Sequence, residues 1–163
     1  MLVYGLLILS AYLIGSIASA VLVCKVLVKE DPRTQGSGNP GATNVLRLHG
    51  KQAAILTLIG DAAKGFIPVF LVSIINVPPT VIAATGLAAF IGHLYPVFFQ
   101  FRGGKGVATF VGVLLGTYWL LGLGFIVIWS LMALVFRYSS LSALVAAALT
   151  PVITFWLFPG LAF

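Results

Sequence analysis

Long apolar runs separated by short polar connections make up most of the chain. A bilayer core of about 30 Å requires roughly 17 to 25 apolar residues per helix, and six segments approach or reach this length. The sequence therefore predicts an all-α polytopic membrane protein, with residues 1–163 forming a single integral membrane domain. The predicted spans are Met1–Val23, Ala53–Ile75, Pro79–Phe98, Val107–Trp119, Leu121–Phe136 and Leu141–Phe158. The boundary between the two shortest, near Gly122 and Gly124, is the least defined.

Composition excludes a water-soluble monomer. Apolar residues make up 61% of the chain, which has nine Lys and Arg and three Asp and Glu residues among 163, so a domain of this size cannot bury its apolar surface. The net charge of +6 is spread over short loops and forms no continuous basic face for nucleic acid. Anionic membrane lipid or a small anionic substrate is the expected partner. The single Cys24 allows no intrachain disulfide, and neither a metal nor a cofactor is expected.

The basic residues predict the orientation, because cytoplasmic loops retain Lys and Arg. All loop cations fall in the first, third and fifth connections: Lys25, Lys29, Arg33, Arg47 and Lys51, then Arg102 and Lys105, then Arg137. The N-terminus is therefore expected outside the inner membrane, with cytoplasmic motif loops at about 24–52, 99–106 and 137–140. A cleaved signal peptide ending near Ala20 is a weaker alternative, since no basic segment precedes the apolar run.

The first connection contains a loop rich in Gly and Asn, from Gly36 to Arg47. Its glycines and proline predict a tight turn with backbone amides free to bind an oxyanion. Thr43 or Asn44 is expected to cap a short helix, and Arg47 would lie on the same face as the cap. The candidate phosphate-binding residues of this loop are Ser37, Gly38, Asn39, Gly41, Thr43 and Asn44, with Arg47 as a candidate catalytic residue. A plain polar linker is the less favoured reading.

Two nucleotide-binding patterns fail in this loop. Gly36, Gly38 and Gly41 match the dinucleotide fingerprint, but that fingerprint requires a preceding strand and a βαβ unit, and neither is predicted. The Walker A pattern fails because Ala42 stands where Lys is needed.

The second predicted span carries Asp61 and Lys64 on one helical face. Charges at this depth are costly and usually face the bundle interior or a water-filled cavity. A structural ion pair and a substrate role remain equally open, with Asp61 as support for the first loop and Lys64 reaching toward the site.

The third connection contains a second candidate phosphate cradle. Gly103, Gly104 and Gly106 allow close approach of backbone to a ligand, and Lys105 supplies a mobile charge. In the less favoured alternative, Arg102 and Lys105 are topology anchors at the level of the lipid headgroups, a purpose they would serve in any case. His93 is grouped with the substrate-binding residues, although a hydrogen-bonded structural role is more usual for a lone histidine.

Three predicted spans, the second, fourth and sixth, start on the cytoplasmic side. Their N-termini carry partial positive charge, and we expect them to gather at one place and bind phosphate. Ser139 and Ser140 open the sixth span as an N-cap or as donors to an oxyanion, and they are candidate catalytic residues. Gly112 and Gly116 form a GxxxG pair suited to close helix packing.

The motifs GSGNPGATNVLR, GDAAKG, GHLYPVFFQFRGGKGVAT and RYSSL, in this order and spacing, closely resemble those of the bacterial acyl-phosphate:glycerol-3-phosphate acyltransferase family, PlsY. The resemblance runs from about Leu9 to Phe158. It implies an inner-membrane enzyme of seven helices that moves a fatty acyl group from acyl phosphate to the 1-position of glycerol 3-phosphate. The product is lysophosphatidic acid, and the step begins phospholipid synthesis.

Carried over motif by motif, the resemblance implies a cytoplasmic site built from Ser37, Gly38, Asn39, Thr43 and Arg47, from Gly103 to Gly106, and from Ser139 and Ser140. The family's last motif, with a His and an Asn near the C-terminus, has no counterpart in these 163 residues, so an inactive truncated form stays open. A transporter of a phosphorylated metabolite is a further alternative.

The expected chemistry is direct attack by the glycerol 3-phosphate hydroxyl on the acyl phosphate. A mixed anhydride has a good leaving group and needs no covalent enzyme nucleophile, and neither GxSxG nor HxxxxD occurs. Backbone amides and Lys105, with Arg47, are expected to stabilise the developing oxyanion and the departing phosphate.

Overall fold

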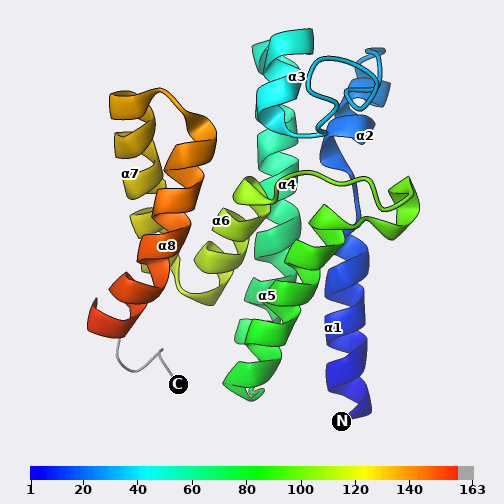
Figure 1. Cartoon of the computed structure of the whole chain (residues 1–163). Coiled ribbons are helices and arrows are strands. Elements are labelled where there is room, and N and C mark those ends of the chain that lie inside the picture. Colours follow the sequence, from blue (N-terminus) through cyan, green and yellow to red (C-terminus); the bar gives the residue numbers. More distant parts are fainter. Residues whose placement is uncertain (158–163) are drawn as a thin grey trace. The chain divides into compact units, whose positions relative to one another are not determined.

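A computed structural model describes residues 1–157 and divides the chain into two compact units, Met1–Thr117 and the residues from Tyr118 onward (Figure 1). Every regular element of residues 1–157 is helical, which confirms the predicted all-α class. The first unit contains α1 (Leu2–Gly15), α2 (Ser19–Val26), α3 (Ala42–His49), α4 (Lys51–Ser73), α5 (Pro79–Leu94), the 3-10 turn η1 (Val97–Phe99) and α6 (Val107–Thr117). The second contains α7 (Trp119–Phe136) and α8 (Ser139–Leu157).

Four helical segments within residues 1–157 are long and apolar enough to cross a membrane, namely α4, α5 with η1, α7 and α8. The bent pair α1 and α2 makes a fifth if it is counted as one span. The predicted fourth span is a helix of only 11 residues, α6. The prediction of six full spans is therefore too high for this part of the chain, and Phe158, the predicted end of the sixth, lies outside the described residues.

The first predicted span is broken. α1 ends at Gly15 and α2 begins at Ser19, and the two helices meet at an angle of 46°, so a continuous helix over Met1–Val23 is wrong. The break leaves the Ile17 carbonyl oxygen for a partner outside the helix, and Lys64 Nζ donates to it at 2.7 Å. An unpaired backbone carbonyl is costly in a bilayer. A lysine from α4 therefore makes the break tolerable.

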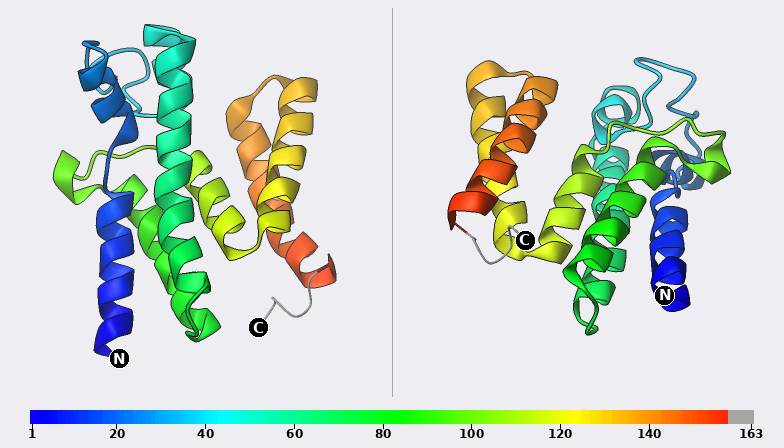
Figure 2. Two further views of the ribbon diagram at one scale, coloured as in Figure 1. Left: turned by 180° about the vertical axis from the view of Figure 1, so that it is seen from behind. Right: turned by 60° about the horizontal axis from the view of Figure 1, so that its bottom comes forward.

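Two pairs of parallel helices in the first unit pack through glycine (Figure 2). In the α1 and α5 pair, a Cβ at Gly15 or at Gly92 would collide with the backbone of the other helix. In the α4 and α6 pair, a Cβ at Gly112 would collide with the Ala62 carbonyl oxygen, and one at Gly116 would lie 2.9 Å from that of Phe66. The predicted packing role of Gly112 and Gly116 is confirmed.

The expected meeting of helix starts is wrong for α4 and α6. Thr109, in the first turn of α6, packs against Gly65, and Gly65 lies about 20 Å along α4 from Lys51 at 1.5 Å per residue. The physical reason is the short length of α6, which begins beside the middle of α4. The N-termini of α4 and α6 therefore do not lie together at one place in this unit.

The second unit is a helical hairpin in which α7 packs on α8. The preceding α6 ends at Thr117 and α7 begins at Trp119, so the boundary expected near Gly122 and Gly124 lies a few residues earlier. Ser139 and Ser140 both fall in the first turn of α8, with exposed side chains.

Candidate active site

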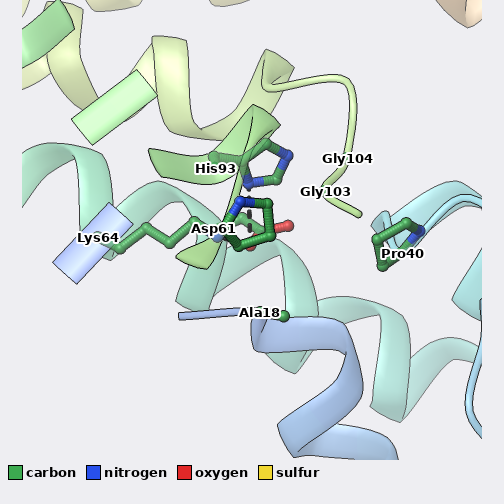
Figure 3. A pocket seen from close by; sticks show the side chains of 8 residues that line it. Ala18, Pro40, Asp61, Lys64, His93, Gly103 and Gly104 are labelled. Atoms are coloured by element: carbon green, nitrogen blue, oxygen red, sulfur yellow. Dashed lines mark ion pairs between the residues drawn. The ribbon is translucent and has the colours of Figure 1, made fainter. Parts of the chain in front are cut away.

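Residues of all three motifs of the first unit line one small pocket (Figure 3). Its volume of about 10 Å³ has room for roughly one water molecule. Seven of its lining residues are labelled in Figure 3, and Pro96 is the eighth. The lining residues are Ala18 from the break in the first span, Pro40 from the first loop, Asp61 and Lys64 from α4, and His93, Pro96, Gly103 and Gly104 from α5 and the third loop.

The buried charges of α4 form the floor of this pocket. Lys64 Nζ lies 2.9 Å from Asp61 Oδ1, and the two side chains are 6% and 4% exposed. Lys64 also donates to Ile17, as described above. His93 Nδ1 lies 3.6 Å from the same Asp61 oxygen, which is longer than a hydrogen bond. The structural reading is confirmed, because Lys64 joins Asp61 to the carbonyl at the helix break. The pair also lines the pocket, and a substrate role for it stays a prediction.

The first loop is held together by Asn44. Its Oδ1 accepts a hydrogen bond from the backbone N–H of Ser37 at 3.0 Å, and its Nδ2 donates to the carbonyls of Pro32 at 2.9 Å and Gln35 at 3.2 Å. Asn44 is buried. The Asn44 side chain is thus a brace, because it joins three backbone groups of the first loop to α3.

The predicted cap of α3 is corrected by the structure. Gly41 is the N-cap, and neither Thr43 nor Asn44 occupies that position, because α3 begins at Ala42. Thr43 and Arg47 nevertheless share the exposed face of α3, one turn apart. The Arg47 side chain makes no hydrogen bond or ion pair within residues 1–157, so its guanidinium is available to an anion.

The other candidate phosphate-binding residues of the first loop differ in their exposure to solvent. Ser37 and Gly38 are exposed, whereas Asn39 and Gly41 are half-buried. Gly38 has a φ of +68°, which favours glycine at this turn. Next to Asn39, Pro40 is buried and lines the pocket.

The third loop is packed onto the end of α5. The N–H of Gly104 donates to the His93 carbonyl at 3.2 Å. A Cβ at Gly103 would collide with that same carbonyl oxygen, and Gly106, at φ +81°, leaves no room for one beside Phe90. Lys105 projects from this fixed backbone as an exposed side chain without a hydrogen bond or ion pair among residues 1–157.

Arg33 joins the first and third loops, a role that no motif in the sequence predicted. Its guanidinium pairs with Asp31 at 2.7 Å, donates to the Phe99 carbonyl at 3.4 Å and lies 5.7 Å from the centre of the Phe99 ring. Hydrogen bonds from Arg33 hold the pKa of the Asp31 carboxyl below its usual value. The Asp-Pro-Arg spacing was a local signal for the ion pair, but nothing local pointed to Phe99.

Ser139 and Ser140 belong to the second unit, so they are described apart from this pocket. Of the predicted site residues, the pocket of the first unit brings together Gly103 and Gly104 with Asp61, Lys64 and His93. Ala18 and Pro96 complete the pocket, and no sequence signal singled them out.

Comparison with known proteins gives one consistent result. A family model described as glycerol-3-phosphate acyltransferase matches residues 5–163. A glycerol-3-phosphate acyltransferase of Methylococcus capsulatus is 61% identical over 155 residues, which cover 95% of this chain and 78% of the relative. That of Thioalkalivibrio sulfidiphilus is 55% identical over 152 residues, covering 93% and 75%.

Solved structures agree with the sequence relatives. A crystal structure of PlsY, an integral membrane glycerol 3-phosphate acyltransferase in its glycerol 3-phosphate form, matches with a TM-score of 0.89 and 40% identity, covering 95% of this chain and 78% of that one. The lysophosphatidic acid form matches with a TM-score of 0.87 and 39% identity, covering 95% and 77%. The chain is thus an integral multi-pass membrane protein, and it belongs to the glycerol-3-phosphate acyltransferase family.

Proposed function

We propose that this chain transfers a fatty acyl group from an acyl phosphate to the 1-position hydroxyl of glycerol 3-phosphate, at the cytoplasmic side of the bacterial inner membrane. As a member of its family, the chain is a glycerol-3-phosphate acyltransferase that forms lysophosphatidic acid. The acyl phosphate donor, the 1-position and the orientation are the finer parts of the proposal.

The convergence of the first and third loops on one pocket is the observation that supports this function best. Pro40 from the first loop, with Gly103 and Gly104 from the third, lines the same pocket. In each motif these residues are followed by an exposed cation without an ion pair among residues 1–157, Arg47 and Lys105 respectively. Both proposed substrates carry a phosphate group, so two cationic loops match the requirement.

The reaction needs no enzyme-bound acyl group. The substrate hydroxyl oxygen attacks the carbonyl carbon of the acyl phosphate, the bond from that carbon to the phosphate oxygen breaks, and inorganic phosphate leaves. The hydroxyl proton goes to a phosphate oxygen of a substrate. Lys105, Arg47 and loop amides stabilise the charge that develops on the carbonyl oxygen and on the leaving phosphate.

The remaining candidates have supporting parts in this proposal. Ser37, Gly38, Asn39, Gly41 and Thr43 bind phosphate oxygens from the first loop, while Asn44 keeps that loop folded. Gly103, Gly104 and Gly106 shape the third loop, and Lys64 and Asp61 close the pocket. Ser139 and Ser140, exposed hydroxyls at the start of α8 in the second unit, stay candidate catalytic residues of the proposal.

The acyl tail of the donor lies against lipid-facing apolar surface. An apolar groove of about 310 Å³ lies between α2 and α4, and its lining includes Gly60, the chain neighbour of Asp61 in the polar pocket. A saturated chain needs no polar partner there. The groove therefore offers a donor tail a place close to the two loops.

The proposed topology is one integral membrane domain with an outside N-terminus. Its cytoplasmic motif loops are residues 24–52, 99–106 and 137–140, the connections that carry all the loop cations. Cysteine labelling at Gln35, in the first loop, and at Asn76, between α4 and α5, tests this arrangement in sealed vesicles. Labelling of Gln35→Cys from the outside would contradict it.

The activity test uses purified protein with radiolabelled glycerol 3-phosphate and palmitoyl phosphate. We expect a lipid-extractable product in the wild type. Loss of one oxyanion donor typically costs about 100- to 1000-fold in rate, so Lys105→Ala and Arg47→Ala should each lose activity in that range. Lys25→Ala is the matched control, since Lys25 is an exposed cation at the end of α2.

Two results would contradict the proposal. Label that enters sealed vesicles without forming lipid would indicate a transporter. Near-wild-type turnover in both Lys105→Ala and Arg47→Ala would remove the loops from the mechanism.

A further inference from the structure

We propose that His93 is a positioning residue for acyl transfer, which fixes the backbone of residues 103–106 and thereby sets the Lys105 side chain, without touching substrate. The inference rests on the proposed function, because it takes the third loop as a phosphate-binding loop. It assigns to His93 a part that is neither acid-base chemistry nor direct substrate binding.

The contacts of the third loop with the last turns of α5 carry the first step. The Gly104 N–H donates to the His93 carbonyl, and the Cβ position of Gly104 faces His93 Nε2 at a distance that would be a collision. Gly103 packs on the carbonyls of His93 and Leu94. The His93 carbonyl thus bonds the loop, and the His93 ring packs against Gly104.

The imidazole faces Asp61 through its other ring nitrogen, at a distance longer than a hydrogen bond. Its Nδ1 faces Asp61 Oδ1 at 3.6 Å, and both side chains are buried. Asp61 is paired with Lys64, and Lys64 is bonded to Ile17 at the break in the first span. The ring therefore lies between a fixed carboxylate and the loop backbone (Figure 3).

This placement argues against proton transfer by His93. One ring nitrogen faces a buried carboxylate and the other is packed on Gly104, and His93 is only 5% exposed. A general base needs a ring nitrogen within hydrogen-bond reach of the substrate hydroxyl. The neighbouring Lys105, in contrast, is exposed and follows directly on the fixed loop.

The first experiment is a double-mutant cycle between His93 and Lys105. A misplaced group can cost up to about 100-fold in rate, so we expect His93→Ala to lower kcat/KM by about 10- to 100-fold in the wild-type background. The loss should fall mainly on the KM of a phosphorylated substrate. In a Lys105→Ala background the same substitution should cost less than about threefold, because the side chain that His93 positions is gone.

Steric rescue gives the second experiment. Gly104→Ala places a methyl group against the imidazole and should lower kcat/KM strongly. Adding His93→Ala opens that space and should restore about tenfold or more of the loss. His93→Gln retains bulk toward Gly104 and should keep more activity than His93→Asn, whose shorter chain does not reach the loop.

Controls separate this inference from folding and from the proposed function. His49→Ala removes a half-buried histidine of α3, which contacts the Glu30 carbonyl and does not line the pocket, and should leave kcat/KM unchanged. Thermal unfolding of each variant shows whether it is folded. If His93→Ala does not fold, the comparison of His93→Gln with His93→Asn tests the positioning role. Additive effects of His93→Ala and Lys105→Ala, or a loss of activity confined to kcat while KM stays unchanged, would overturn the positioning role. A wild type that makes no lysophosphatidic acid would instead overturn the proposed function.

Discussion

Replacing Lys64 with Met should strongly destabilise the first unit, although the two side chains have similar volumes. The Lys64 ammonium pairs with Asp61 at 2.9 Å and donates to the Ile17 carbonyl at 2.7 Å, and both charged side chains are buried. Met fills a similar space but supplies no donor. The substitution therefore leaves a buried carboxylate and a backbone carbonyl without their partner.

The magnitude follows from those two losses. Removing one partner of a buried ion pair typically costs about 3–5 kcal/mol, and an unsatisfied buried carbonyl costs about 1–3 kcal/mol. Protonation of Asp61 limits the first loss, so we expect a total of about 4–6 kcal/mol. For a chain of this size each kcal/mol shifts the midpoint by about 2–4 °C, which gives a fall in Tm of roughly 10–20 °C.

Thermal unfolding in detergent provides the measurement. The double variant Asp61→Asn with Lys64→Met removes the uncompensated charge and should recover most of the loss, leaving the carbonyl cost. Lys25→Met changes an exposed cation and should alter stability by no more than about 0.5 kcal/mol. A Lys64→Met protein that melts within about 2 °C of the wild type, or a double variant no more stable than the single one, would refute the reasoning.

Three further predictions concern packing, charge and the first loop. Gly112→Ala should lower the free energy of unfolding by about 1–3 kcal/mol in thermal unfolding, because its Cβ would meet a backbone carbonyl of α4. Gly5→Ala, where a Cβ would lie in open space, should not destabilise the protein. Equal effects of the two substitutions would contradict the tight contact. Arg33→Ala should raise the pKa of Asp31 toward its ordinary value, because the hydrogen bonds from Arg33 that lower it are lost; NMR titration follows the change. Since the folded pKa is depressed, the stabilisation that Arg33 supplies is present above the unfolded pKa and is lost as pH falls through the folded one; an unchanged Asp31 pKa would count against the pairing. Asn44→Ala removes three hydrogen bonds and should make the first loop cleavable by protease, while an equally resistant loop would show that the brace is dispensable.

The pattern of apolar runs was sufficient to predict the helical class and most spans. The ranges of α4, α7 and α8 agree with the predicted ones to within a few residues, because run length and turn residues are local signals. The break between α1 and α2 was not predictable in this way. It depends on Lys64, 47 residues further along the chain, and no local window contains that partner.

The sequence predicted which motifs form the candidate site, but it did not predict how these motifs are arranged in space. Glycine-rich loops with cations pointed to phosphate binding at two loops, and Pro40 and Gly104 from these loops do line one pocket. Which element supports which loop could not be foreseen. The contacts of Asn44 and of Arg33 join backbone groups whose positions depend on the folded loops, and the depth at which α6 begins depends on its packing against α4.

The depth at which α6 begins has a consequence for release of the proposed product. α6 begins beside Gly65, about 20 Å along α4 from Lys51. The loop of residues 103–106, which leads into α6, therefore lies further along the axis of α4 than the residue at which α4 starts. In the proposed topology a lysophosphatidic acid made beside this sunken loop already has its hydrocarbon tail among the lipid chains. It can escape sideways into the inner leaflet while only its headgroup rises to the interface, so release requires no passage of the tail through water.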